Sequence, residues 1–252
     1  MKDVRAKKHL GQHFLNDHQI AFEITDLLSN NTKNVVEIGP GMGVLTQFLV
    51  QKKFNTEVVE IDTESVFYLS LNYPQLEGNI IEGDFLQLNL VEQFPYPFSL
   101  IGNFPYNISS QILFKAFENH DQIPEVVGMF QKEVAERIAC KKGKKRGILS
   151  VFLQAFYDVE YCFTVDELVF TPPPKVKSGV VRLVRNDRTT LSCDEKIFKQ
   201  LVKAGFNQRR KTLRNALKPF TLTNESELQD LLALRAEQLS VDDFIKLTNH
   251  VG

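Results

Sequence analysis

The sequence predicts an α/β fold: a doubly wound, mostly parallel sheet followed by a small helical domain. Up to Gly147, short runs rich in Val and Ile alternate with stretches of helical period, which is typical of βαβ units. Four successive strand-like runs are each followed by a glycine loop, an acid or an amide. Beyond about Asn186 the remaining periods are helical.

The elements follow in order from the apolar periodicity. The expected strands are residues 34–39, 56–62, 79–84, 98–103 and 125–131, and the expected helices are residues 44–52, 65–73, 109–120 and 132–140. Ser109 or Ser110 is the expected N-cap of the third of these helices.

The chain after Gly147 has a different pattern. A helix is expected over residues 148–157, strands over 158–165 and 178–185, and a long helix over 194–217. Three successive prolines from Pro172 exclude helix and central strand between the two strands. We therefore expect a sheet domain over residues 1–186 and a helical domain over residues 187–252.

Composition narrows the class of protein. A chain of 252 residues with 43% hydrophobic content can bury a sizeable core. No apolar run is long enough to span a bilayer, and the N-terminus lacks the apolar segment of a secretory signal. Cys140, Cys162 and Cys193 form no C-x-x-C motif. These features lead us to expect a cytoplasmic protein with no membrane partner.

Positive charge is segregated although the net charge is −1. Residues 199–218 hold seven Lys or Arg and no acid, and residues 141–146 hold five more around one glycine. Two such clusters indicate a polyanion such as RNA, with phosphate contacts from Lys141, Lys142, Lys144, Lys145, Arg146, Arg209, Arg210, Lys211 and Arg214. We expect the last four on one helix. The alternatives are solvated faces, or pairing with the acids between Glu225 and Asp243.

Polar residues at four strand ends predict a nucleoside site. The loop "EIGPGMG" from Glu37 follows the first strand, and its spacing departs from the G-x-G-x-x-G of dinucleotide sites. Glu60 could accept from ribose hydroxyls, and Asp84 from an adenine amino group. With Asn103 they should converge at the carboxyl edge of the sheet. Each acid could instead be a helix N-cap.

In the order of its motifs the chain resembles Class I S-adenosylmethionine methyltransferases with a Rossmann-like sheet, and more closely the KsgA-type small-subunit rRNA adenine dimethyltransferases. The motifs are "LGQHFL", "EIGPGMGVLT", "VVEID", "GNFPYNIS", "FQKEVAERI", "FTPPPKVKSGVVRL" and "FNQRRKTLRNAL". The resemblance implies cofactor contacts at His13, Leu15, Gly39, Gly41, Glu60, Asp84 and Asn103. His13 stands where the family usually has Asn, and it could instead be a structural histidine.

The resemblance also implies the reaction. Methyl groups would pass from S-adenosyl-L-methionine to the N6 amino groups of two adjacent adenosines in the 3′-terminal hairpin loop of 16S rRNA. This would happen on an immature small subunit, leave S-adenosyl-L-homocysteine, and require no metal. We expect the protein to be a monomer.

The stretch "NFPY" fits this chemistry. Asn103 Oδ1 and the Phe104 carbonyl could accept from the adenine amino group, because Pro105 biases Phe104 to an extended conformation. Tyr106 would offer a stacking face. The resemblance suggests Phe170 as a second stacking ring, with a core position as the alternative.

Three rival functions remain open on the sequence. They are methylation of large-subunit rRNA by an erythromycin-resistance type enzyme, a nucleotide-dependent oxidoreductase, and a ribosome-assembly factor that binds RNA without methylating it.

Overall fold

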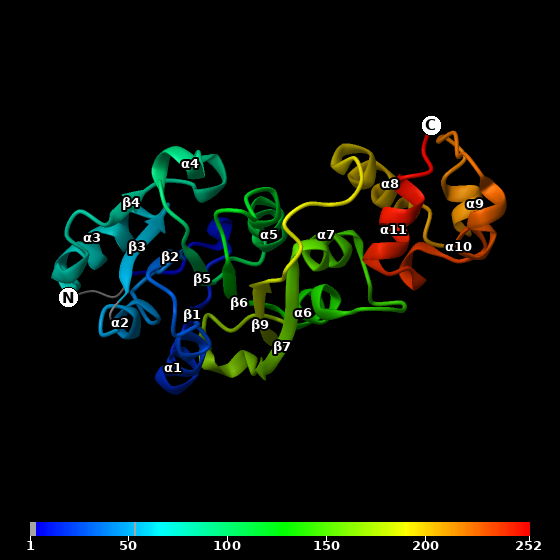
Figure 1. Ribbon diagram of the computed structural model, residues 1–252. Helices are drawn as coiled ribbons and strands as arrows, with labels where there is room; N and C mark the ends of the chain where they lie inside the picture. Colours follow the sequence, from blue (N-terminus) through cyan, green and yellow to red (C-terminus); the bar gives the residue numbers. More distant parts are fainter. Residues whose placement is uncertain (1–3, 53) are drawn as a thin grey trace. The chain divides into compact units, whose positions relative to one another are not determined.

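The computed structural model describes residues 4–52 and 54–252, which form two compact units (Figure 1). One unit contains the described residues up to Ala135 together with Val159–Arg185. The other contains Glu136–Asp158 together with Asn186–Gly252. The expected division into domains of residues 1–186 and 187–252 stays a prediction, since a compact unit is defined by contacts and a domain by independent folding. Residues 1–3 and 53 of the first expected domain lie outside the described residues.

A seven-stranded sheet is the frame of the first unit, with the order β4-β3-β2-β5-β6-β9-β7 (Figure 1). The strands are β2 (Asn34–Ile38), β3 (Asn55–Glu60), β4 (Ile80–Glu82), β5 (Ser99–Asn103), β6 (Glu125–Gln131), β7 (Tyr157–Val165) and β9 (Ser178–Arg185). The pairs from β4 to β6 are parallel, and β9 is antiparallel to β6. The predicted α/β fold with a doubly wound, mostly parallel sheet is confirmed. Its central strands are nearly continuous apolar runs because helices cover both faces.

Short helices connect these strands. They are α1 (His18–Asp26), α2 (Thr46–Leu49), α3 (Thr63–Asn72), α4 (Leu90–Gln93), α5 (Ser109–Glu118) and α6 (Lys132–Ala139). The prediction that Ser109 or Ser110 caps α5 is wrong, because Ile108 occupies the N-cap position and no side chain caps the helix. The Ser109 hydroxyl instead donates to the Tyr106 carbonyl, 3.2 Å away.

A two-stranded sheet ties the N-terminal segment to the proline run. In it β1 (Phe14–Leu15) is antiparallel to β8 (Phe170–Thr171), with Leu15 opposite Phe170. Both of these residues belong to one buried cluster with Ile24 of α1. Because of this pairing, the residues just before Phe14 lie next to the sheet of the first unit.

The second unit is helical apart from the start of β7. Its helices are α7 (Ile148–Phe156), α8 (Glu195–Asn207), α9 (Leu213–Ala216), α10 (Gln229–Ala233) and α11 (Val241–Thr248). The predicted continuous helix over 194–217 is wrong, because a turn interrupts it between Asn207 and Leu213. The break turns Leu213 into the core, where it is fully buried and its N–H donates to the Leu234 carbonyl at 2.7 Å. Burying this side chain outweighs the helical preference of the segment.

Glu37 is an acid inside the apolar strand β2. Its side chain is buried, and Thr46 Oγ1 donates to its Oε2 at 2.6 Å. Burial raises the pKa of Glu37 to about 8, with the Thr46 hydrogen bond opposing and the nearby Glu60 reinforcing the shift. The folded protein thus keeps a proton that the unfolded chain releases, so the free energy of unfolding falls as the pH rises from about 4.5 to about 8.

We predict that Glu37→Gln stabilises the protein increasingly as the pH rises through this window. The neutral amide has no charge to bury, so its advantage should grow by at most ~1.4 kcal/mol per pH unit. Urea unfolding at about pH 4.5 and about pH 8 checks this. The exposed Glu92→Gln is the matched control. An advantage of Glu37→Gln that is equal at both pH values would contradict the buried neutral carboxyl.

Candidate functional site

A cavity of about 590 Å³ opens at the carboxyl ends of β2, β3, β4 and β5 in the first unit. Gly39, Glu60, Asp84 and Asn103, which follow or end these four strands, all line it. The convergence predicted from the sequence is therefore present. The volume lies within the range of small-molecule and cofactor sites.

The glycine loop forms one wall of the cavity by bringing bare backbone to its surface. Gly39 and Gly41 have φ values of 64° and 57°, which side chains adopt only with strain. A Cβ at Gly41 would also lie 2.7 Å from a ring carbon of Phe14. Glycine is therefore required at position 41 by conformation and by the close approach of the N-terminal segment.

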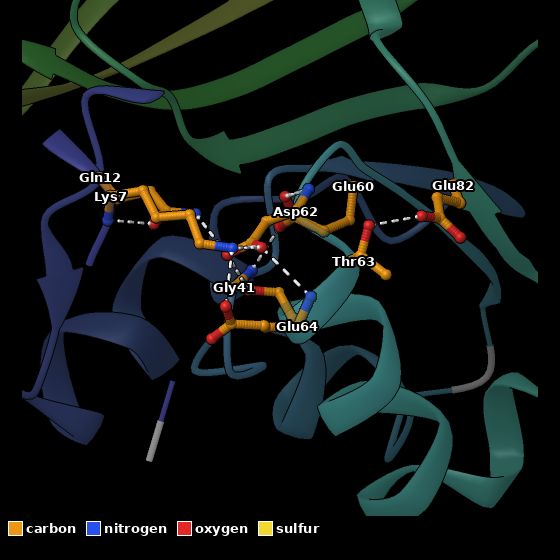
Figure 2. A network of polar contacts seen from close by, with 9 residues as sticks. Lys7, Gln12, Gly41, Glu60, Asp62, Thr63, Glu64 and Glu82 are labelled. Atoms are coloured by element: carbon orange, nitrogen blue, oxygen red, sulfur yellow. Dashed lines mark hydrogen bonds and ion pairs between the residues drawn. The ribbon is translucent and has the colours of Figure 1, made fainter. Parts of the chain in front are cut away.

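Glu60 is a buried carboxylate whose direction is fixed by the backbone (Figure 2). Its Oε2 accepts from the Gly41 N–H at 3.0 Å and its Oε1 from the Asp62 N–H at 2.9 Å. Burial raises the pKa of Glu60, and these two hydrogen bonds partly oppose the rise. The residue lines the cavity, so its remaining lone pairs can accept from a ligand.

Asp84 is a helix N-cap, as one of the two alternatives had it, and its contact with an adenine amino group stays a prediction. Its Oδ1 accepts from the Leu86 N–H at 2.9 Å and caps the short 3₁₀ helix Phe85–Gln87. It also lines the cavity. The turn after it is held by Lys115 of α5, whose Nζ donates to the carbonyls of Phe85, Leu86 and Leu88. These contacts fix the turn that follows Asp84.

The side chain of Asn103 is oriented by the N-terminal segment. Its Nδ2 donates to the His13 carbonyl at 2.9 Å, so its Oδ1 remains as an acceptor at the cavity. The Phe104 ring is buried beneath the site against Phe130, with the ring centroids 5.1 Å apart. That anchor fixes the backbone of Phe104, whose carbonyl accepts no hydrogen bond from residues 4–52 and 54–252.

Tyr106 and His13 form a second wall. Their rings stack with centroids 5.5 Å apart and an angle of 30° between planes. The Tyr106 hydroxyl lies 2.5 Å from Ser178 Oγ, and His13 Nδ1 lies 2.7 Å from the Pro172 carbonyl. A carbonyl oxygen can only accept, so His13 donates through Nδ1. Burial raises the pKa of Tyr106.

The sequence did not indicate every residue of the cavity. Glu37, Gln12 and Ile61 also line it. An acid within an apolar strand was a usable signal for Glu37. Nothing in the sequence distinguished Gln12, which reaches the cavity because β1 pairs with β8.

Phe170 and Arg146, which were predicted to contact RNA, are both buried. Phe170 is 2% exposed and packs in the core cluster with Leu15, as its core alternative requires. Arg146 is 1% exposed, and its Nη1 donates to the Cys140 carbonyl and to Gln154 Oε1. Contrary to the prediction for Arg146, its guanidinium is enclosed and cannot reach a phosphate from this position.

The other basic residues predicted to contact RNA lie in the second unit. Some of them are held by backbone carbonyls or acids, and the rest are exposed without an ion pair among the described residues. Arg209 donates to the carbonyls of Lys144 and Arg146, so it joins the loop 141–146 to the turn after α8. Further ion pairs join Arg209 to Glu237, Arg214 to Glu225 and Lys145 to Glu136. Exposed side chains without such a pair among the described residues are Lys141, Lys142, Lys144, Arg210 and Lys211.

Membrane and metal features were also sought among residues 4–52 and 54–252. No helix there is both long and apolar enough to cross a bilayer. No group of three His, Cys, Asp or Glu side chains there is arranged to hold a metal ion.

Comparison with known proteins places this geometry in a family. The sequence profile described as "Ribosomal RNA adenine dimethylase" matches residues 4–251. A protein of Cytophaga hutchinsonii named ribosomal RNA small subunit methyltransferase A is 62% identical, over 99% of this chain and 98% of its own length.

Solved structures share the fold. A dimethyladenosine transferase from Plasmodium falciparum superposes with a TM-score of 0.76 at 26% identity, over 93% of this chain and 96% of that one. The 23S rRNA methyltransferase ErmE superposes with a TM-score of 0.71 at 23% identity, over 93% and 99%, a likeness of fold alone. A profile match over nearly the whole chain, together with the identity to the Cytophaga protein, shows that the chain belongs to the ribosomal RNA adenine dimethylase family.

Proposed function

We propose that the protein transfers methyl groups from S-adenosyl-L-methionine to the N6 amino groups of two adjacent adenosines in the 3′-terminal hairpin loop of 16S rRNA. The observation that carries this proposal is the orientation of Asn103, whose amide NH₂ donates a hydrogen bond to the His13 carbonyl. Its Oδ1 is thereby presented as an acceptor at a cavity that also holds Glu60 and Asp84. Membership in the adenine dimethylase family supports the reaction class.

The cavity suits S-adenosyl-L-methionine in size and in its polar groups. Glu60, held by two backbone N–H groups, would accept from the ribose hydroxyls, and Asp84 would accept from the adenine amino group. Gly39, Gly41, His13 and Leu15 would line the rest of the cofactor. When bound, the cofactor supplies a methyl group already activated by a positive sulfur, so the proposed chemistry requires no metal.

The residues of "NFPY" would position the target base. Asn103 Oδ1 and the Phe104 carbonyl would accept from the two amino hydrogens and turn the nitrogen lone pair away from the ring. An amide cannot act as a general base, so the contribution is orientation and electrostatic stabilisation, and the proton leaves to water. Tyr106 offers an aromatic face, and stacking is worth ~1–3 kcal/mol per base.

The proposed substrate is 16S rRNA within an immature small subunit. The name of the Cytophaga relative supports the small subunit over the large one. Incubation of the protein with radiolabelled cofactor and unmethylated small or large subunits, followed by mapping, tests this directly. Label at the two adjacent adenosines of the small subunit is the expected result, and label in large-subunit rRNA would overturn it.

With rRNA as substrate, we propose a cytoplasmic enzyme that acts as a monomer.

Exposed cations of the second unit would bind the RNA backbone. Arg209 brings the loop that carries Lys141, Lys142 and Lys144 next to the turn that carries Arg210 and Lys211. Such side chains contact phosphates and carry no base specificity. Arg209 itself and Arg146 hold the loop and are proposed to be structural.

Replacing Glu60 with Gln should weaken cofactor binding in a protein that still folds. The amide loses charge-assisted hydrogen bonds to the ribose, so the dissociation constant should rise at least ~10-fold. The protein should still fold, because the amide removes a charge that burial disfavours, although its NH₂ cannot accept from one of the two backbone N–H groups that Glu60 binds. Calorimetry and thermal melting check both, with the exposed Glu77→Gln as control. Unchanged affinity would remove Glu60 from the cofactor site.

Asn103→Ala should reduce the turnover number by ~10²–10³-fold, the loss seen when one positioned polar group is removed from a transition state. RNA affinity should change little, because the phosphate contacts lie elsewhere. Single-turnover methyl transfer and RNA binding measured on the same preparation separate the two. Methyl transfer at a near wild-type rate would show that Asn103 is not the acceptor.

Replacing Lys141, Lys142 and Lys144 together with Ala should weaken RNA binding and flatten its salt dependence. The slope of log K against log salt should fall by ~0.7 for each lost contact with single-stranded RNA. Lys196→Ala is the control, because this exposed lysine lies in the first turn of α8, away from the loop. Arg209→Ala should instead lower the melting temperature, since it removes two carbonyl contacts. An unchanged slope in the triple variant would place the RNA elsewhere.

A further inference from the structure

The N-terminal strap, residues 7–16, forms one side of the cofactor cavity. Every residue from His9 to Asn16 lines this cavity. The strap lies against the loops of three neighbouring strands, since it contacts Asp62 after β3, Gly41 after β2 and Asn103 at the end of β5. A ligand that fills the cavity therefore lies between the strap and the strand ends.

The two halves of the strap are held differently. The second half is fixed by backbone pairing of β1 with β8 and by the bond from Asn103 to the His13 carbonyl. The first half is a compact turn, in which the Lys7 N–H donates to Gln12 Oε1 and the Gly11 N–H donates to the Lys8 carbonyl. Side chains attach this turn to the rest of the unit.

The side chains of Lys7 and Gln12 both donate to Asp62 (Figure 2). The ammonium of Lys7 forms a hydrogen-bonded ion pair with Asp62 Oδ1, and Gln12 Nε2 donates to Oδ2 at 3.2 Å. Lys7 also lies 3.1 Å from a carboxylate oxygen of Glu64. Both ends of the turn are thus fastened to one carboxylate.

Asp62 is a rigid anchor joined to the candidate ribose-binding residue. Its carboxylate is buried and caps α3, accepting from the Glu64 N–H and from Ser65 Oγ, each at 3.2 Å. Its own N–H donates to Glu60 Oε1 at 2.9 Å. The point where the strap is fastened and the carboxylate assigned to the ribose therefore belong to one hydrogen-bonded strand end.

We propose that Lys7 and Gln12 are positioning residues that hold the strap closed on the cofactor through Asp62, so that breaking this latch sets the rate of cofactor release. The proposal rests on the proposed function, because it takes the cavity to be the S-adenosyl-L-methionine site. The strap lines the cavity along its length from His9 to Asn16, so its opening would uncover a bound ligand. The first half is the part that can move without breaking the β1–β8 pairing.

The latch is tested by the release rate of radiolabelled S-adenosyl-L-methionine, chased with unlabelled cofactor, from the full-length protein and its variants. Lys7→Met should speed release by about tenfold, the effect of losing one charge-assisted hydrogen bond. Turnover at saturating cofactor should stay near that of the parent. Lys8→Met makes the same change in charge at an exposed neighbour and should release at the parental rate. Lys7→Arg should restore slow release.

A second readout needs no cofactor. Amide hydrogen exchange over residues 7–12 of the protein alone should be faster in Lys7→Met and in Gln12→Leu than in Lys8→Met, because the turn opens more often. Gln12→Leu keeps the test available if Lys7→Met does not fold. Parental release and exchange rates in both latch variants would overturn the latch. Failure of the parent protein to bind the cofactor would instead overturn the proposed function.

Discussion

The parallel alignment of β4, β3, β2 and β5 is the constraint on which the site depends. Parallel neighbours end at the same edge, so residues far apart in sequence are brought to one cavity. The register fixes this closely, since Val36 of β2 lies opposite Glu57 of β3 and Leu100 of β5. Each strand then delivers one group at or just after its end: bare backbone at Gly39, carboxylates at Glu60 and Asp84, and an acceptor at Asn103.

Burial of acids gives this edge its electrostatic character. Glu37 and Glu60 are both buried beside the cavity, and burial raises the pKa of each. Removing a carboxylate from water costs free energy that a cationic ligand nearby can offset. The cofactor of the proposed reaction carries a positive sulfur, which would favour the charged form of Glu60, whereas the neutral Glu37 carboxyl adds no charge near pH 7. Backbone N–H groups at Gly41 and Asp62 keep Glu60 in place meanwhile.

Residues of one chemical type have different roles here according to their hydrogen-bond partners. Arg146 and Arg209 belong to the same basic clusters as Lys142 and Lys211, yet the two arginines hydrogen-bond to backbone carbonyls and fix a loop. A planar guanidinium with several donors can hold more than one carbonyl at once, while the exposed lysines leave their charge at the surface. The clusters therefore combine a rigid support with an exposed cationic surface.

Local pattern was enough to predict the sheet and the core of the site. The Val- and Ile-rich runs predict strands, and a glycine loop, Glu60, Asp84 and Asn103 stand at their ends. Once the strands are parallel, these residues must meet at one edge of the sheet. The same reasoning was wrong where long-range burial opposes local preference. The helix expected to continue past Asn207 is interrupted so that Leu213 can enter the core.

Contacts between distant segments were decided by the tertiary structure alone. Lys7 and Asp62 are 55 positions apart, and their meeting depends on the pairing of β1 with β8 and on the cap of α3. The burial of Arg146 depends in the same way on which segments surround it. Periodicity records which face of an element is apolar, but it does not record which other element covers that face. The sequence by itself therefore determined the chemistry at the strand ends, and the tertiary structure decided which side chains close over it.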